Sequence, residues 1–430
     1  MTDRKMIYLC LAHMSEDGME QKYVKEAFDT NWVVPMGPNV NAFEQDLANM
    51  ANSKLDGTET LDRKVVCLSA GTAAVHLALI ACGVQAGDEV LVQSFTFCAS
   101  SHPITYLGAK PVFIDSERET WNMDPELLEK AIIDRKEKTG KYPKAIIPVA
   151  LYGMPYNCER IMTIADKYGI PVIEDAAEGM GSRFDGQVLG TFGRFGVLSF
   201  NGNKMITTSG GGALICRNAE DANEIMWYAT QARDAYPYYE HTAIGYNYRM
   251  SNVCAGIGRG QMTVLDAHIA HHKHVQELYK ELLKDVNGVT LHEQPADVRY
   301  DSNFWLCAAT LDPSVKIVGQ QNAYKEVINN AVGGAAGVIK AVDSAITECQ
   351  PNDNVEALRV FMLNKKVECR PVWKPMHKQP VYADAVAYVN GVSEEIFKVG
   401  FCLPAGPYVT DEDVHYIVDC IKEAIVSYEC

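Results

Sequence analysis

The central part of the chain alternates short apolar runs with longer helical patterns. Each run is continuously apolar rather than alternating, which is typical of strands buried on both faces of a sheet. Helical patterns at 73–83 and 158–169 lie between runs, where the crossovers of parallel strands are expected. The pattern predicts an α/β fold with a mostly parallel central sheet. The apolar runs cover residues 65–69, 89–94, 111–115, 145–151, 171–175, 197–200 and 212–216.

The pattern changes after about residue 265. Long helical patterns at 264–286 and 394–402 are accompanied by only a few strand-like pieces. We therefore expect two domains, a large one over residues 1–265 and a smaller C-terminal α+β domain over residues 266–430. The segment 329–354 is the nearest approach to low complexity, and the sequence predicts no function for it.

Composition narrows the possible classes of protein. Of the 430 residues, 47% are hydrophobic and 22% are charged, which is close to the globular average and predicts a packed core. The formal net charge of −16 opposes a phosphate backbone, so nucleic-acid binding is not expected. No apolar stretch approaches the roughly 20 residues of a membrane helix, and the N-terminal apolar run is too short for a signal peptide. We expect a cytoplasmic protein.

Cysteine and histidine patterns favour neither disulfides nor a metal site. The thirteen cysteines are odd in number and scattered from Cys10 to Cys430, which predicts reduced thiols used as small core residues. Four histidines on one predicted helix have i, i+3 and i+4 spacings, but no nearby Asp, Glu or Cys completes a ligand set. We expect a solvated helix face and no metal. The four are His268, His271, His272 and His274.

Two candidate sites follow buried strands, and ligands of open α/β sheets bind at such strand ends. The small residues 69–73 open a helix, whose free N–H groups and dipole suit a phosphate; an ordinary capped turn is the alternative. Asp175 follows Glu174 at the end of another strand. A buried carboxylate needs a cation or hydrogen-bond donors, and a protonated pyridine nitrogen would be such a cation. A helix N-cap is the alternative for this pair.

A third candidate is Lys204, which follows the strand 197–200 and precedes the glycine-rich segment 207–212. Desolvation just after a buried strand favours a neutral amine, which is the form that Schiff-base chemistry requires. An exposed loop lysine is the alternative.

The order and spacing of these motifs resemble those of the DegT/DnrJ/EryC1/StrS family of sugar aminotransferases. The resemblance extends over nearly the whole chain and is nearest to a bacillosamine-type branch of the family. It rests on SAGTAAVHLAL (69–79), SFTFCAS (94–100), IEDAAEGMGSRFDGQVLGTFGRFG (173–196), LSFNGNKMITTSGGGAL (198–214) and GYNYRMSN (245–252), with EAFDTNWVVPMGPNVNAFE (26–44) and CRPVWKPMHKQPVY (369–382) at its two ends.

The resemblance implies an aspartate-aminotransferase-like fold (fold type I) with pyridoxal 5′-phosphate as the cofactor. Lys204 would carry the cofactor as a Schiff base, and Asp175 would pair with its pyridine nitrogen. Phe97 would stack on the pyridine ring, a plain core aromatic being the alternative. The cofactor's phosphate would be held by Gly71, Thr72 and Ser199.

Two further positions bear on the implied site. Glu178 departs from the commoner Gln or His; we expect it to face the cofactor's 3-hydroxyl, where an anion would oppose the phenolate, or else to lie on a solvent-facing helix. Asn247 looks like the family residue that crosses the subunit interface to the neighbouring phosphate, a turn asparagine being the alternative. The resemblance therefore implies a homodimer with shared active sites.

The implied reaction transfers an amino group from L-glutamate to a nucleotide-linked 4-keto-6-deoxyhexose in bacterial surface-glycan sugar biosynthesis. Lys204 would then be the general base between the donor's α-carbon and the cofactor. A 3-keto-sugar or keto-inositol aminotransferase would share every cofactor residue. A sugar dehydratase of the family would carry histidine in place of Lys204, and a non-catalytic cofactor-binding regulatory protein is the rival of a different class.

Overall fold

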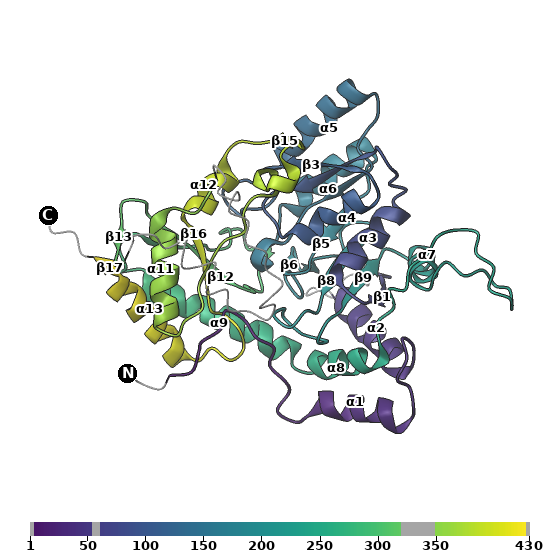
Figure 1. The fold of residues 1–430 in the computed structure, drawn as a ribbon, viewed down its shortest axis with the longest axis horizontal. Coiled ribbons are helices and arrows are strands. Elements are labelled where there is room, and N and C mark those ends of the chain that lie inside the picture. The colour runs from purple at the N-terminus through teal and green to yellow at the C-terminus, as the bar shows by residue number, and fades with distance from the viewer. Residues whose placement is uncertain (1–3, 54–60, 320–348, 427–430) are drawn as a thin grey trace.

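A mixed sheet runs through the larger body of this computed structural model, which describes residues 4–53, 61–319 and 349–426 (Figure 1). The strand order is β15-β3-β2-β4-β5-β8-β9-β1, with β4 and β5 joined by two isolated parallel bridges. Every pairing from β15 to β8 is parallel, and β9 is antiparallel to both of its neighbours. The predicted α/β fold with a mostly parallel sheet is therefore confirmed. The strands are β1 (Lys64–Leu68), β2 (Glu89–Gln93), β3 (Lys110–Ile114), β4 (Ala145–Ile147), β5 (Ile173–Asp175), β8 (Phe195–Ser199), β9 (Gly212–Cys216) and β15 (Val386–Tyr388).

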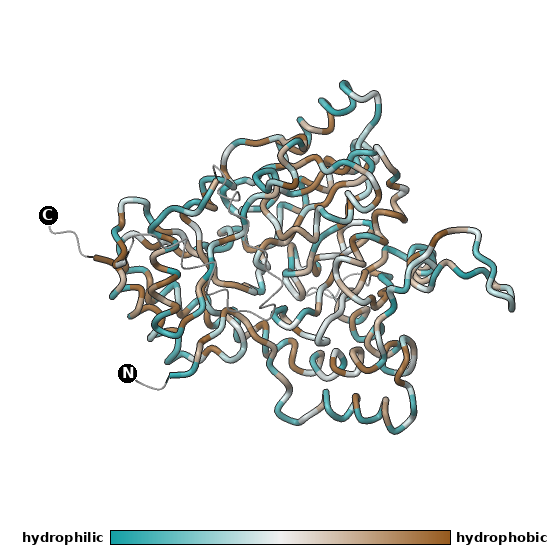
Figure 2. The backbone as a smooth tube through the Cα atoms, in the orientation of Figure 1, coloured by the Kyte–Doolittle hydropathy of each residue, from teal (hydrophilic) through white to brown (hydrophobic). Residues whose placement is uncertain are grey.

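Both faces of this sheet are buried, as the continuously apolar runs predict. Val65 and Cys67 of β1 contribute to one hydrophobic core, and the alternate residues Val66 and Leu68 contribute to another. One core is completed by α2 (Pro38–Ala51), α5 (Pro125–Thr139) and α6 (Cys158–Tyr168). The other is completed by α3 (Gly71–Ala81), α4 (His102–Tyr106) and α7 (Ala219–Ala229). In Figure 2, brown hydrophobic segments are concentrated in the interior of this body and teal hydrophilic segments toward its outside.

A smaller antiparallel sheet lies to the left of the large sheet in Figure 1. Its order is β10-β12-β16-β14, and three helices share a separate hydrophobic core with it. The strands are β10 (Val289–Leu291), β12 (Cys307–Leu311), β14 (Arg370–Pro371) and β16 (Gly400–Leu403), and the helices are α9 (Leu265–Leu283), α11 (Asp353–Asn364) and α13 (Asp411–Ala424).

Two pairings link segments on either side of residue 265. Ile7 forms a parallel bridge with Val367, and β15 pairs with β3. The domain division at 265/266 stays a prediction. Below the large sheet in Figure 1, α1 (Met19–Asp29) packs along α8 (Asn252–Met262). Of the segment 329–354, residues 329–348 lie outside the described part of the chain.

The expectation of a solvated histidine face on α9 is wrong for two of the four histidines. His268 and His272 are 5% and 0% exposed, because they share the buried stripe of the helix with Leu265 and Val275. His274 is exposed and pairs with an aspartate of α13 at 2.8 Å. Among the residues that the structure describes, no group of three or more potential ligands could hold a metal ion.

Over the same residues, no helix is long and apolar enough to cross a membrane. The twelve cysteines in the described ranges form no disulfide with one another, and nine of them are buried.

Candidate active site

A cavity of about 360 Å³ opens at the carboxyl ends of β5 and β8, beside the N-terminus of α3. Short turns after three strands bring side chains from distant parts of the sequence into its wall, as expected for an open α/β sheet. Seven of the eight predicted site residues line this cavity. They are Gly71, Thr72, Phe97, Asp175, Glu178, Ser199 and Lys204.

The N-terminus of α3 forms one wall of the cavity. Its N-cap residue, Ala70, supplies no side-chain hydrogen bond, so the predicted alternative of an ordinary capped turn is wrong. The turn is closed by β9: a Cβ atom on Gly212 would lie 2.4 Å from the Gly71 nitrogen, so this close approach requires glycine. Ser199 lies beside Gly71. Uncapped N–H groups and the positive end of the helix dipole therefore meet a hydroxyl group here.

Asp175 lies at the end of β5 and is 6% exposed. Its carboxylate accepts hydrogen bonds from the Ser100 hydroxyl at 2.6 Å and from the Ala177 N–H at 3.1 Å. Burial raises the pKa of Asp175, and the Ser100 hydrogen bond opposes that rise. The chain continues from it as a turn, so Asp175 is not the N-cap of a helix. Among the described residues no cation forms an ion pair with this buried carboxylate, although the charge of Lys204 acts on it from a greater distance, and the position suits a cationic partner.

Glu174 serves the fold rather than the cavity. Its two carboxylate oxygens accept the backbone N–H groups of Gly190, Phe192 and Gly193 at 2.6–2.9 Å. The three bonds satisfy a buried carboxylate and hold the turn that leads into β8.

Lys204 and Glu178 form an ion pair inside the cavity. The Lys204 Nζ atom lies 3.3 Å from Glu178 Oε1, and the lysine and glutamate side chains are 14% and 5% exposed. Glu178 Oε2 also accepts the Tyr152 N–H at 2.7 Å. Burial raises the pKa of Glu178, Lys204 opposes the rise, and Asp175 adds to it. The two alternatives, an exposed loop lysine and a solvent-facing glutamate, are both wrong.

Two aromatic rings border the open side of the cavity. Phe97 is half exposed rather than part of the core, and its ring centroid lies 5.2 Å from that of Trp373. Both rings also line an adjoining cavity of about 530 Å³. His102, Lys374 and Gln379 add polar atoms to that second cavity, which extends the site toward solvent.

Asn247, the eighth predicted residue, does not line the cavity of its own chain. It is exposed and pairs through a β-bridge with Thr230. The segment between these residues leaves the body after α7 and extends far to the right in Figure 1. It exposes Tyr238 at 67% and Ile244 at 84%. An exposed apolar segment of this kind marks a surface suited to contact with another protein.

Comparison with known proteins adds to this geometry. The sequence profile of the DegT/DnrJ/EryC1/StrS aminotransferase family matches residues 14–334 and 339–422. The chain belongs to this family. It is 40% identical to the "Putative pyridoxal phosphate-dependent aminotransferase EpsN" of Bacillus subtilis strain 168, over 99% of this chain and 97% of that protein. It is 32% identical to the GDP-perosamine synthase of Escherichia coli O157:H7, over 97% and 99% of the two chains.

A solved structure supports the same assignment. A DegT/DnrJ/EryC1/StrS aminotransferase from Brucella abortus superposes with a TM-score of 0.78 at 25% identity, over 95% of each chain. The sequence resemblance and the implied fold are therefore confirmed for this member of the family.

Three residues at or next to the cavity were not predicted from the sequence. Ser100 does not line the cavity but donates to the Asp175 carboxylate, and it could have been found because it ends the motif SFTFCAS. Trp305 and Trp373 are separated from the other cavity residues by about one hundred residues or more and follow no glycine-rich turn. No local pattern marks them.

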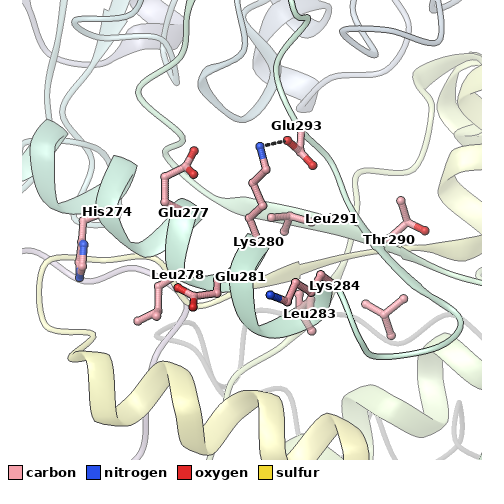
Figure 3. Close-up of a pocket in the computed structure, with 11 residues that line it drawn as sticks. His274, Glu277, Leu278, Lys280, Glu281, Leu283, Lys284, Thr290, Leu291 and Glu293 are labelled. Carbon is pink, nitrogen blue, oxygen red and sulfur yellow. Dashed lines mark ion pairs between the residues drawn. The ribbon is translucent and has the colours of Figure 1, made fainter.

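A further cavity, which shares no residue with the two described above, lies along α9 (Figure 3). It is lined mainly by charged side chains of the helix and by β10, and Lys280 pairs with Glu293 across it at 2.5 Å. Apart from His274, which was not expected to bind a ligand, no residue singled out from the sequence lines it. The predicted site residues lie instead around the cavity at the carboxyl ends of the strands of the large sheet.

Proposed function

We propose that this chain is a pyridoxal-phosphate-dependent sugar aminotransferase that transfers the amino group of L-glutamate to a nucleotide-linked 4-keto-6-deoxyhexose. One observation carries the proposal: the buried pair of Lys204 and Glu178 lies beside Asp175 in a cavity whose wall includes an uncapped helix N-terminus. An amine, a buried carboxylate and an anion site are the three partners that the aldehyde, ring nitrogen and phosphate of this cofactor require.

The α3 N-terminus is the end of the cavity suited to the cofactor's phosphate. Gly71 and Thr72 begin the helix and have no side-chain cap competing for their N–H groups, and Ser199 adds a hydroxyl donor. An oxyanion there interacts with the helix dipole as well as with the individual donors.

Asp175 is the residue suited to the pyridine nitrogen. A protonated ring nitrogen would give this buried carboxylate a cation in direct contact, in addition to the more distant charge of Lys204. When bound, the cofactor supplies an electron sink for the electrons left by the departing α-proton. Phe97, half exposed at the mouth of the cavity, can cover one face of the ring.

Lys204 is the residue proposed to form the covalent link and to move the proton. With the cofactor and donor bound, Lys204 Nζ would be the base positioned to take the proton from the donor's α-carbon and to return it on the cofactor side. Glu178 lies 3.3 Å from this nitrogen and is suited to the cofactor's 3-hydroxyl. Burial raises the pKa of Glu178, which is the direction that a carboxyl donating to that oxygen requires.

The adjoining cavity is suited to the acceptor. Phe97 and Trp373 separate it from the Lys204 cavity, and Lys374 supplies a cation near its mouth. Flat rings next to a cation match the base, sugar and diphosphate of a nucleotide-linked sugar.

We further propose a homodimer that shares its active sites. The exposed segment that ends in Asn247 leaves its own cavity untouched and carries apolar side chains that a second copy would cover. Symmetric pairing is the commonest way for one surface to complete two sites, here by bringing Asn247 to the partner's phosphate. Such an enzyme would act in the cytoplasm, where nucleotide-linked sugars are made.

The proposal is tested by offering the purified protein, loaded with the cofactor, a panel of nucleotide-linked keto-sugars together with glutamate. Mass spectrometry would detect the amino sugar and 2-oxoglutarate in equal amounts. We expect product from a 4-keto-6-deoxyhexose. Product from 3-keto-sugars or keto-inositols alone would overturn the substrate assignment, and the absence of any turnover would overturn the enzymatic assignment.

A further inference from the structure

One segment between β11 (Tyr300–Asp301) and β12 holds both partners of the buried ion pair. The ring of Trp305 lies under the Lys204 ammonium, with Nζ 4.1 Å from the ring centroid. The indole N–H of Trp305 donates to the Asn203 carbonyl at 2.6 Å. A single side chain that is 1% exposed therefore contacts the lysine's charge and fixes the backbone just before it.

The same segment also holds Glu178. Asn303 is fully buried, and its Nδ2 atom donates to the carbonyls of Glu178 and Met180 at 2.9 Å each. Its Oδ1 atom accepts the backbone N–H of Trp305 at 2.8 Å. Asn303 thus links the backbone of Glu178 to the backbone of Trp305, whose ring lies under the lysine.

The backbone of this segment is held in a disfavoured conformation. Phe304, between the two residues, has a φ of +48°, and its carbonyl accepts the Nδ1–H of His272 at 3.1 Å. Burial lowers the pKa of His272 to about 3, so the ring is neutral and can donate from this nitrogen. On the other side, a Cβ atom on Gly153 would lie 1.8 Å from Asn303 Oδ1. Strain of this kind persists only where surrounding contacts enforce it.

We propose that Trp305 is a positioning residue that stabilises the protonated form of Lys204, the form present after its Nζ has taken the donor's α-proton and before it gives that proton up. This inference rests on the proposed role of Lys204. The face of an indole attracts a cation and does not attract a neutral amine to the same extent, so the contact favours the state after proton abstraction. Burial of the ring keeps water from weakening the attraction.

The proposal predicts two effects of opposite sign. In the cofactor-free protein at neutral pH, a weaker ring–cation contact leaves more of Lys204 as neutral amine, so its reaction with acetic anhydride becomes faster. In the loaded enzyme, the same change slows exchange of the α-proton of glutamate with deuterated water. From the usual strength of a buried cation–π contact, we expect each rate to change by about tenfold.

The sharpest variant replaces Trp305 with tryptophans of increasing fluorination, which keep the shape of the ring while withdrawing charge from its face. The same replacement at Trp121 is the matched control, because that ring is 6% exposed and stacks on His292 outside the Lys204 cavity. Trp305→Phe retains a ring face and should change both rates by less than about threefold, whereas Trp305→Leu removes it. Fluorinated residues keep the test valid should Trp305→Leu fail to fold.

We expect increasing fluorination of Trp305 to accelerate Lys204 acetylation and to slow α-proton exchange step by step. Fluorination of Trp121 should change neither rate. If either rate is unchanged across the series, the inference is wrong. Borohydride reduction in the presence of the cofactor separates this outcome from failure of the proposed function. If that reduction does not label Lys204 in the unsubstituted protein, the proposed function fails. If Lys204 is labelled but fluorination of Trp305 leaves the two rates unchanged, only the role of Trp305 is overturned.

Discussion

The assignment of Asp175 to the cofactor's ring nitrogen leads to an asymmetry between two neighbouring carboxylates. Asp175→Asn removes the negative charge without changing the shape of the side chain. Glu178→Gln is the matched change three residues away, in a side chain that is equally buried at 6% exposure. Only the first change removes the group that is proposed to stabilise the charged ring.

The expected losses follow from the contacts of each carboxylate. Two unit charges about 3 Å apart attract by about 5 kcal/mol at an effective dielectric constant of about 20. Loss of one preorganised partner in an active site costs about 3–4 kcal/mol. We therefore expect Asp175→Asn to lower kcat by about 10³-fold, equivalent to about 4 kcal/mol. Glu178→Gln keeps an acceptor for the Tyr152 N–H at 2.7 Å and should cost less than about tenfold.

The assay is the single-turnover reaction of the loaded enzyme with glutamate, followed by mass spectrometry of 2-oxoglutarate. Circular dichroism and the content of bound cofactor establish that each variant is folded and loaded. Equal losses in the two variants, or a larger loss at position 178, would show that the ring lies in the opposite orientation and would refute the assignment of Asp175.

Three other outcomes follow from the same structure. Lys204→Ala should abolish turnover and leave the fold intact, because the side chain is needed for covalent chemistry. Borohydride reduction of the unsubstituted enzyme should label Lys204, and labelling of another lysine would contradict the assignment. Inactive Lys204→Ala chains mixed with inactive Asn247→Asp chains should regain partial activity, since one site of each mixed dimer has both residues intact; mixed dimers that form and stay inactive would argue against shared sites. The pKa of His272 is about 3 in the folded state, below the value of 6.5 for a free side chain. Because the unfolded chain therefore binds more protons, the free energy of unfolding should fall as the pH drops below about 6.5, by about 1.4 kcal/mol per pH unit. His272→Asn keeps a donor for the Phe304 carbonyl and should flatten the dependence of the denaturant midpoint on pH between 7 and 5, whereas an unchanged slope would assign the acid sensitivity elsewhere.

Local patterns were sufficient for seven of the eight strands of the central sheet, β15 being the exception, and for most of the cavity wall. Strands buried on both faces must be continuously apolar, so β1, β2 and β3 could be recognised from their side chains alone. The carboxyl ends of β5 and β8 lie at one edge of the sheet, which brings Asp175 and Lys204 together without any detailed knowledge of packing. The strand ends were less accurate: β4 ends at Ile147, whereas the predicted apolar run continues to residue 151.

The histidines of α9 illustrate where such reasoning fails. Polar residues at helical spacing predict a solvated face, yet His268 and His272 are buried. Each places its Nδ1 atom on a backbone carbonyl of another segment, Met205 or Phe304, and that hydrogen bond offsets the cost of burying the ring. A partner that lies dozens of residues away has no signature in the local pattern.

The sequence by itself determined the class of fold, the family, and seven of the residues that line the cavity, because burial, turns and covalent chemistry each demand particular residue types at particular places. Only the tertiary structure decided how those residues act on one another. The contact of Lys204 with Glu178, the position of Trp305 under the ammonium, and the exclusion of Asn247 from its own cavity all depend on which distant segments pack together. Those arrangements are set by long-range burial of side chains, and the free energy of such contacts is a property of the packed core rather than of any stretch of the chain.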